Sequence, residues 1–115
     1  MKRGEVYLCP IGRRDGAGHE LLVPVVVLTR DAINAHGPVV VVAPVLDDEL
    51  SAHPYPSDVV VRAPEGGLTN DGVILTMQLR SIPRHQLRHR LGTLSASIMA
   101  EVDRALRITL DLEER

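Results

Sequence analysis

The sequence predicts an α+β domain, in which a small and strongly bent antiparallel sheet or barrel carries helices on one side. Three observations predict it. Fifteen valines and no Phe or Trp favour strands, because the χ1 angle of valine is already restricted on a pleated strand. Short apolar runs separated by Gly and Pro follow one another along most of the chain. Apolar residues then recur at helical spacing near the C-terminus. The length suits one domain spanning residues 1–115.

Five apolar runs are expected to form strands, at residues 4–12, 22–30, 39–46, 57–64 and 72–82. Pro24 cannot donate a ladder hydrogen bond, so it should lie near the start of its strand or on an edge. Four consecutive valines, residues 39–42, indicate burial on both faces of the third strand or a central place in a closed barrel.

The connections are read from their Gly, Asn and Asp residues. Residues 13–20 are expected to form a loop, because Gly16 and Gly18 interrupt the apolar pattern. Residues 31–38 are expected to connect two strands and to hold a helical turn. Residues 65–72 read as a turn rich in Gly and Asn/Asp.

The periodicity changes after the fifth strand. Pro83 suits the first turn of a short helix. Residues 92–112 predict a longer helix, with Ser95 as its N-cap. Its apolar face is expected to consist of Leu94, Ile98, Val102, Ala105, Leu106, Thr109 and Leu110.

Charge is distributed unevenly, although the net charge is only −2. Residues 80–90 contain four arginines and two histidines and no acid, whereas acids gather at residues 46–49 and 111–115. The basic segment is either a face for an anion or an ordinary solvated face. Cys9 is the single cysteine and fits a reducing compartment. The first residues do not resemble a signal peptide, and the apolar runs are too short to span a bilayer. A soluble, intracellular protein without membrane contact is therefore expected.

Several functions are disfavoured by the residues present. Residues 12–19 lack the Gly-Lys-Ser/Thr of a phosphate-binding loop and precede a strand instead of a helix. His85 and His89 have metal-ligand spacing, but they lack a third ligand and lie among arginines, so no metal is expected. No nucleophile motif supports a covalent hydrolase. Only Tyr7 and Tyr55 could stack on bases, which argues against an aromatic single-strand platform.

The order of motifs along nearly the whole chain resembles the MazF/PemK family, the toxins of toxin–antitoxin pairs. The resemblance rests on these motifs: Arg3-Gly4-Glu5-Val6-Tyr7, Gly67-Leu68, Gln78-x-Arg80-x-Ile82, Arg88, Gly92-x-Leu94, Ala105-Leu106 and Leu110. It implies an SH3-like barrel with a C-terminal helix, of the CcdB/MazF-like kind, working as a homodimer. It also implies a metal-independent, cytoplasmic endoribonuclease without a cofactor. Its substrate would be single-stranded RNA, chiefly mRNA, and its inhibitor a cognate antitoxin with an acidic, flexible tail.

Two family positions carry other residues in this chain. The family usually has Arg-Pro at the start of the second strand, where this chain has Val23-Pro24. It usually has Thr or Ser at the end of the third strand, where this chain has Leu46. Some relatives use Arg and Asp just before the Gln-x-Arg motif, where Leu75 and Met77 stand here. Only Gln78 and Arg80 transfer by position.

Cleavage by the ribose 2′-hydroxyl needs a base near that hydroxyl and a cation for the charge on the phosphorane. The loop after the first strand could supply both. We therefore expect catalysis from Arg14, His19 and Glu20. RNA binding is expected from Arg13, Gln78, Arg80 and Arg84.

Two other readings remain open. The charged loop can be a plain solvated hairpin, because loops are polar by default. The chain would then be a catalytically degenerate relative that binds a protein partner. Alternatively it is an RNA-binding module, with phosphate contacts from the arginines of residues 80–90.

Overall fold

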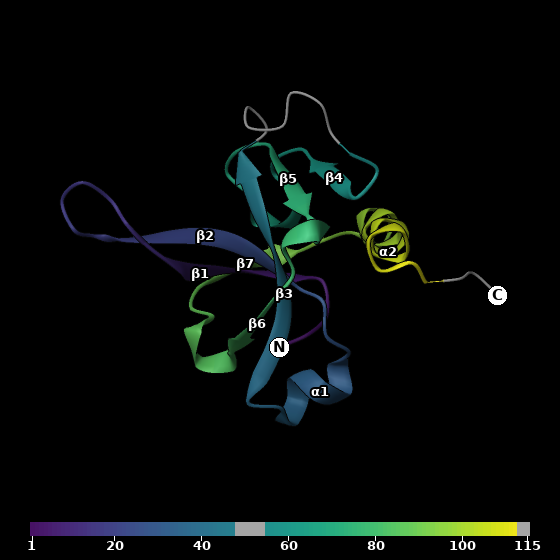
Figure 1. Ribbon diagram of the computed structural model, residues 1–115, viewed down its shortest axis with the longest axis horizontal. Coiled ribbons are helices and arrows are strands. Elements are labelled where there is room, and N and C mark those ends of the chain that lie inside the picture. The colour runs from purple at the N-terminus through teal and green to yellow at the C-terminus, as the bar shows by residue number, and fades with distance from the viewer. Residues whose placement is uncertain (48–54, 113–115) are drawn as a thin grey trace.

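The structure, a computed structural model, describes residues 1–47 and 55–112, apart from the side chains of Ile11 and Arg13. A strongly bent antiparallel sheet forms a half-barrel, and one long helix packs on one side (Figure 1). The hydrogen-bonded strand order is β4-β5-β3-β2-β1-β7, and β6 also pairs with β3. This is the predicted fold class. Acids expected at positions 48–49 and 113–115 lie outside the described residues.

β1 (Glu5–Arg14) and β2 (Glu20–Val27) form a long hairpin that projects from the half-barrel (Figure 1). The expected loop of residues 13–20 is therefore shorter than predicted, since Arg14 and Glu20 are still paired across the strands. β2 pairs with β3 only from Val25 on. Pro24 consequently lies where β2 has one partner strand, and its missing N–H breaks no ladder.

β3 (Val39–Asp47) is the central strand. It pairs with β2, then with β5 (Gly72–Leu75) near its end and with β6 (Arg80–Pro83) near its start. The prediction of one strand over residues 72–82 is wrong, because the 3-10 turn η3 (Thr76–Gln78) separates β5 from β6. β4 (Asp58–Val61) completes this end of the sheet.

Thr76 explains the break between β5 and β6. Its side chain is fully buried, and its hydroxyl donates to the carbonyl oxygen of Ser57 at 2.5 Å. The hydroxyl of Thr109 lies 2.7 Å away. With its side chain turned inward, Thr76 has its hydrogen bonds satisfied although it is buried. The turn at Thr76 lets β5 pair with the end of the curved β3 and β6 with its start.

Smaller elements connect the strands. The helix α1 (Asp31–His36) is the helical turn expected in residues 31–38. Its Asn34 is fully buried and exchanges hydrogen bonds with Thr29. The 3-10 turns η2 (Glu65–Gly67) and η4 (Arg84–Gln86) follow β4 and β6. The short helix expected at Pro83 is thus a single 3-10 turn.

The C-terminal helix α2 (Ala96–Leu110) begins at Ser95, as predicted, and the Ser95 hydroxyl accepts the Ile98 amide at 3.3 Å. Residues 92 and 93, expected to open the helical segment, instead belong to the strand β7 (Arg90–Thr93) beside β1. Val102 and Ala105 are buried, whereas Leu110 is half exposed, so the predicted apolar face does not extend to the last turn.

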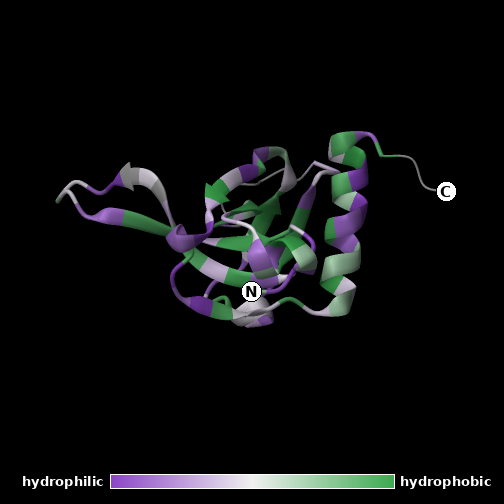
Figure 2. Cartoon of the chain, turned by 90° about the horizontal axis from the view of Figure 1, so that it is seen from below, coloured by the Kyte–Doolittle hydropathy of each residue, from purple (hydrophilic) through white to green (hydrophobic). Residues whose placement is uncertain are grey.

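Two apolar clusters fill the half-barrel, one on each face of the sheet. The cluster under α2 is formed by Val6, Val26, Leu28, Ala43, Val45, Val59, Val61, Leu68, Ile74, Leu94, Val102 and Ala105. The cluster on the opposite face is formed by Cys9, Val25, Val27, Val40, Val42 and Leu87. Figure 2 shows hydrophobic residues concentrated in the strands and alternating with hydrophilic ones along α2. Valine therefore fills both cores, as the composition indicates.

In the part of the chain that the structure describes, no helix is both long enough and apolar enough to cross a membrane.

Candidate functional site

The hairpin tip is held by its own hydrogen bonds. The carboxylate of Asp15 accepts the amides of Ala17 and His19, both at 2.9 Å. The amide of His19 is the main reason why the pKa of Asp15 lies below its ordinary value. Asp15 also holds the His19 ring, with Nδ1 at 3.3 Å from Oδ2, and Arg14 Nη1 donates to the Gly18 carbonyl at 2.9 Å. Arg14 and His19 are thus engaged in local structure at the tip.

Glu20 is the first residue of β2, directly after the tip, and it faces a different group. Arg88 Nη1 and Glu20 Oε2 form an ion pair of 3.0 Å, with side chains 52% and 39% exposed. Both line a hollow of about 300 Å³, which we call the hairpin hollow; its lining is Pro10, Gly12, Glu20, His85, Gln86 and Arg88. The structure therefore brings Glu20 together with His85 and Arg88, and it leaves His19 at the tip.

The basic segment of residues 80–90 reaches the hollow because it follows the outer edge of β1. The Leu8 amide donates to the His89 carbonyl, and the Arg88 amide donates to the Leu8 carbonyl, each at 2.9 Å. Before it, β6 is anchored to β3, with Arg80 opposite Val42. Backbone pairing at both ends thus fixes where the side chains of η4 project.

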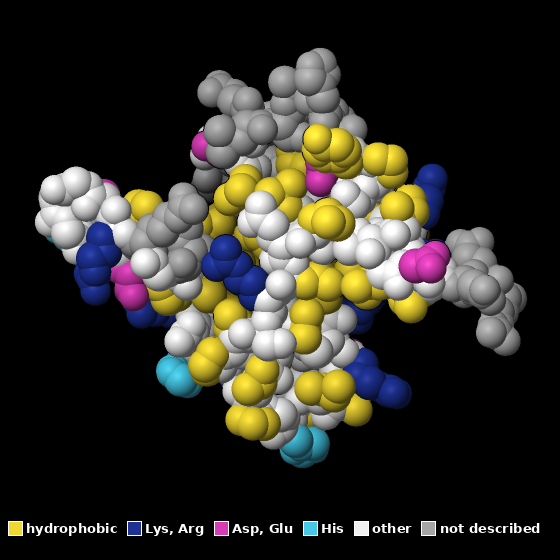
Figure 3. All heavy atoms as spheres, in the orientation of Figure 1, with side chains coloured by type: hydrophobic (Ala, Val, Ile, Leu, Met, Phe, Trp, Pro, Cys, Tyr) yellow, Lys and Arg dark blue, Asp and Glu magenta, His cyan; other side chains and the backbone are white. Residues whose placement is uncertain are grey.

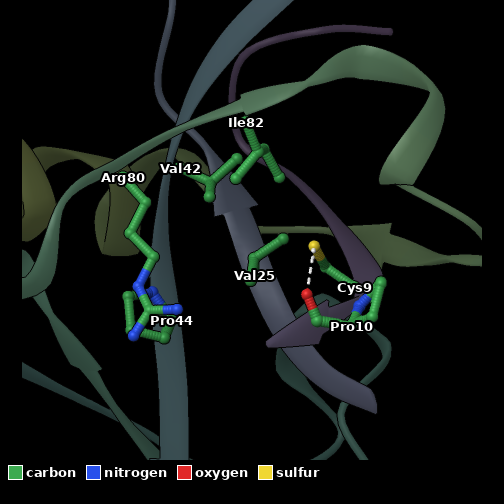
Figure 4. A pocket seen from close by; sticks show the side chains of 7 residues that line it. All are labelled: Cys9, Pro10, Val25, Val42, Pro44, Arg80 and Ile82. Carbon is green, nitrogen blue, oxygen red and sulfur yellow. Dashed lines mark hydrogen bonds between the residues drawn. The ribbon is translucent and has the colours of Figure 1, made fainter. Parts of the chain in front are cut away.

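Arg80 borders a second, smaller space next to the hairpin hollow. The Arg80 pocket has a volume of about 20 Å³ and is lined by Cys9, Pro10, Val25, Val42, Pro44, Arg80 and Ile82 (Figure 4). In Figure 4 the Arg80 side chain extends from its strand to lie over Pro44, opposite Cys9. Pro10 lines both spaces, so the two are neighbours.

The thiol of Cys9 reports the charges around this face. Burial raises its pKa above the ordinary value, the guanidinium charges of Arg80 and Arg88 act against that rise, and the Glu20 carboxylate adds to it. The charges of Arg80, Arg88 and Glu20 therefore all influence the Cys9 thiol. Figure 3 shows Lys and Arg side chains on the projecting hairpin and near the middle of the face in view, among hydrophobic surface.

The other RNA-binding candidates are spread more widely. Gln78 is exposed at the end of η3. Arg84 is half-buried, and its Nη1 donates to the Gly37 carbonyl at 3.5 Å. The side chain of Arg13 lies outside the described residues. Among the three whose side chains the structure describes, Arg80 is the one that lines the pocket beside the hairpin hollow.

Comparison with known proteins identifies the family. A family model described as PemK-like, MazF-like toxin of type II toxin–antitoxin system matches residues 2–110. The chain belongs to this family. A relative from Staphylococcus epidermidis named Endoribonuclease MazF is 35% identical over 112 residues, which are 97% of this chain and 92% of the relative.

Solved structures of the PemK/MazF type have the same fold. A mycobacterial endoribonuclease in complex with its cognate antitoxin superposes with a TM-score of 0.83 at 21% identity, covering 100% of this chain and 99% of that one. A MazE–MazF structure from Deinococcus radiodurans gives a TM-score of 0.71 at 28% identity, with 97% of each chain covered.

The two family positions that differ in this chain lie on the neighbouring strands β2 and β3. Val23 pairs with Cys9, so its side chain lies on the Cys9 face of the sheet. Leu46 lines a third space of about 310 Å³, the leucine hollow, together with Leu8, Leu22, Pro24, Val45, Asp47, Leu68, Thr69, Asn70, Asp71, Gly72 and Leu91. Apolar side chains thus stand where the family resemblance implies a phosphate cation and a hydroxyl.

His85 and Arg88 line the hollow beside Glu20 and were not among the predicted catalytic residues. The available signal was the run of Arg and His without acids in residues 80–90. That run indicates an anion-binding face, but it does not reveal that Glu20 lies opposite. Among the described residues, no group of three His, Cys, Asp or Glu side chains is arranged to hold a metal ion.

Proposed function

We propose that this PemK/MazF family member is a metal-independent endoribonuclease toxin that cuts single-stranded RNA, chiefly mRNA, on the Cys9 face of its sheet. Membership of the family, which includes the relative named Endoribonuclease MazF, gives the activity. The observation that carries the location is the Glu20–Arg88 ion pair at an open hollow, beside the pocket that Arg80 lines.

The physical basis is phosphate binding. Arg80 and Arg88 are both exposed and lie on either side of Pro10. A guanidinium is always charged and presents planar N–H groups that match phosphate oxygens. Two such groups, one on β6 and one beside β1, can hold phosphates of a flexible single strand. Arg84 and Gln78 extend the proposed RNA surface along the same segment, and Arg13 extends it onto the hairpin.

The test is cleavage of single-stranded RNA by the purified protein in EDTA. We expect fragments ending in a 2′,3′-cyclic phosphate and a 5′-hydroxyl, because the nucleophile is already in the substrate. RNA that stays intact, while a known ribonuclease cuts it under the same conditions, would contradict the proposal.

A second candidate is a catalytically degenerate family member that binds RNA or protein. Val23 and Leu46, at the positions where the family usually has Arg and Thr or Ser, favour it. It predicts growth arrest on expression with transcripts left intact, or saturable RNA binding without cleavage. The EDTA assay therefore separates the two candidates.

The proposed partners are a cognate antitoxin and a second copy of the chain. An acidic, flexible antitoxin tail would pair with Arg80 and Arg88, so the purified antitoxin should release bound RNA. A homodimer should have about twice the monomer mass of 12.6 kDa in light scattering. The proposed location is the cytoplasm, where mRNA is accessible.

A further inference from the structure

We propose that the hairpin hollow is the catalytic centre, with Glu20 as the general base, His85 as the general acid and Arg88 as the phosphate cation. The inference rests on the proposed ribonuclease function, and it replaces the hairpin-tip groups Arg14 and His19 in the reaction.

The first argument is the composition of the hollow. Of its six lining residues, Glu20, His85 and Arg88 are one carboxylate, one imidazole and one guanidinium. Cleavage of RNA without a metal needs two proton-transfer groups and one fixed cation. The volume of about 300 Å³ leaves room for a phosphodiester between them.

The second argument is the geometry of the ion pair. Arg88 reaches Glu20 through Nη1 at 3.0 Å, and both side chains are accessible to solvent. A guanidinium has five N–H donors in a fixed fork. Arg88 can therefore orient the carboxylate with one of them and turn others toward a phosphate in the hollow. Arg80, next to the hollow, is placed to hold a neighbouring phosphate.

The third argument is the contrast with the hairpin tip. His19 is bound through its ring and its amide to Asp15, and its side chain is 80% exposed. Water surrounds it, so the tip offers little electrostatic advantage. His85 instead shares a concave surface with an oriented carboxylate.

The reaction is a single in-line displacement. Glu20 takes the proton from the 2′-hydroxyl as the 2′-oxygen forms a bond to phosphorus. The bond from phosphorus to the 5′-oxygen breaks, and protonated His85 gives its proton to that oxygen. The products are a 2′,3′-cyclic phosphate and a 5′-hydroxyl, Glu20 is left protonated and His85 neutral, and solvent restores both. Arg88 stabilises the charge on the non-bridging oxygens.

The test uses two short RNA substrates that differ in one atom. In the second, sulfur replaces the 5′-bridging oxygen at the cut site, and a thiolate leaves without needing a proton. We expect His85→Ala to cut the ordinary RNA about 10²- to 10³-fold more slowly, and to cut the sulfur substrate close to the wild-type rate. Glu20→Gln should be slow on both substrates, and Glu20→Asp should recover part of the rate.

His36→Ala is the matched control, since His36 is an exposed histidine on α1. Circular dichroism melting and RNA-binding anisotropy check that each variant folds and binds. Wild-type protein that cuts no RNA would contradict the proposed function. If wild-type protein cuts RNA, three results would overturn this assignment alone. The first is His85→Ala cutting ordinary RNA at the wild-type rate, and the second is His85→Ala staying slow on the sulfur substrate. The third is His19→Ala being the variant with the reduced rate.

Discussion

Arg90 Nη1 lies 2.7 Å from Oε2 of Glu5, so an exposed arginine on β7 neutralises a buried carboxylate on β1. Oε1 of the same carboxylate accepts the Lys2 amide at 2.6 Å and the Tyr7 hydroxyl at 3.0 Å. Burial acts to raise the pKa of Glu5, but the hydrogen bonds from Arg90, the Lys2 amide and Tyr7 outweigh it. The pKa of Glu5 is therefore lowered from its ordinary value of 4.5.

Glu5 should make stability depend on acid. A carboxyl whose pKa is lower in the folded state stabilises the fold above pH 4.5, and that contribution is lost as the pH falls through the folded pKa. Glu5→Gln should cost about 1–2 kcal/mol at neutral pH and flatten the loss of stability on acidification. Urea unfolding between neutral pH and about pH 3 measures both. If Glu5→Gln loses stability on acidification as steeply as the wild type does, the pH dependence comes from other carboxyl groups.

Gly67→Ala should destabilise the fold strongly. Gly67 has φ +77, and a Cβ there would overlap the carbonyl group of Leu91 on β7. Backbone strain and the clash together should cost at least about 2 kcal/mol. Gly12→Ala is the matched control, since Gly12 has φ +79 with nothing within 4 Å of a Cβ. The midpoint of thermal unfolding of each variant separates the two causes, because Gly12→Ala carries backbone strain without a clash. Equal decreases of the midpoint in the two variants would show that the clash at Gly67 relaxes.

Thr76→Val should loosen the turn between β5 and β6. Because the Thr76 hydroxyl donates its hydrogen to Ser57, the neighbouring Thr109 hydroxyl must donate to Thr76. Valine keeps the shape but leaves both partners unsatisfied, which should cost about 1–3 kcal/mol in the free energy of unfolding. The exposed Thr69→Val variant should be nearly neutral by urea titration. A neutral Thr76→Val would mean that water replaces the hydroxyl.

Arg80→Ala should weaken RNA binding and make the affinity less dependent on salt concentration. If Arg80 holds one phosphate, its loss should reduce the slope of log affinity against log salt by about 0.7, the value for one contact to a single strand. Fluorescence anisotropy with a labelled RNA at several salt concentrations measures the slope. Arg104→Ala, on α2, should leave it unchanged. A slope that Arg80→Ala does not alter would place Arg80 outside the phosphate path.

The strands and α2 could be predicted because their signals are local. Valine runs, the capping Ser95 and the helical spacing act within a few residues. The break at Thr76 could not be predicted, because its cause is a hydrogen bond to Ser57 and a helix 33 residues away. β7 was missed for a similar reason, since four residues beginning with Arg90 become a strand only beside β1.

The candidate site divides in the same way. The basic character of residues 80–90 is a property of composition and was predicted. The partner of each charge is a property of the fold, because Glu20 and Arg88 are 68 positions apart in sequence and meet through the pairing of Leu8 with residues 88 and 89. Sequence reasoning chose Glu20 as a catalytic residue, which stays a prediction, and it chose the partners of Glu20 by proximity in the chain.

The placement of residues 88 and 89 along the edge of β1 has a consequence for synthesis of the protein. The strands β1 and β2 can pair as soon as both are made, but Leu8 receives its other backbone partners only after residues 88 and 89 have been made. On the ribosome, the proposed RNA face therefore cannot be complete until residue 90 has emerged.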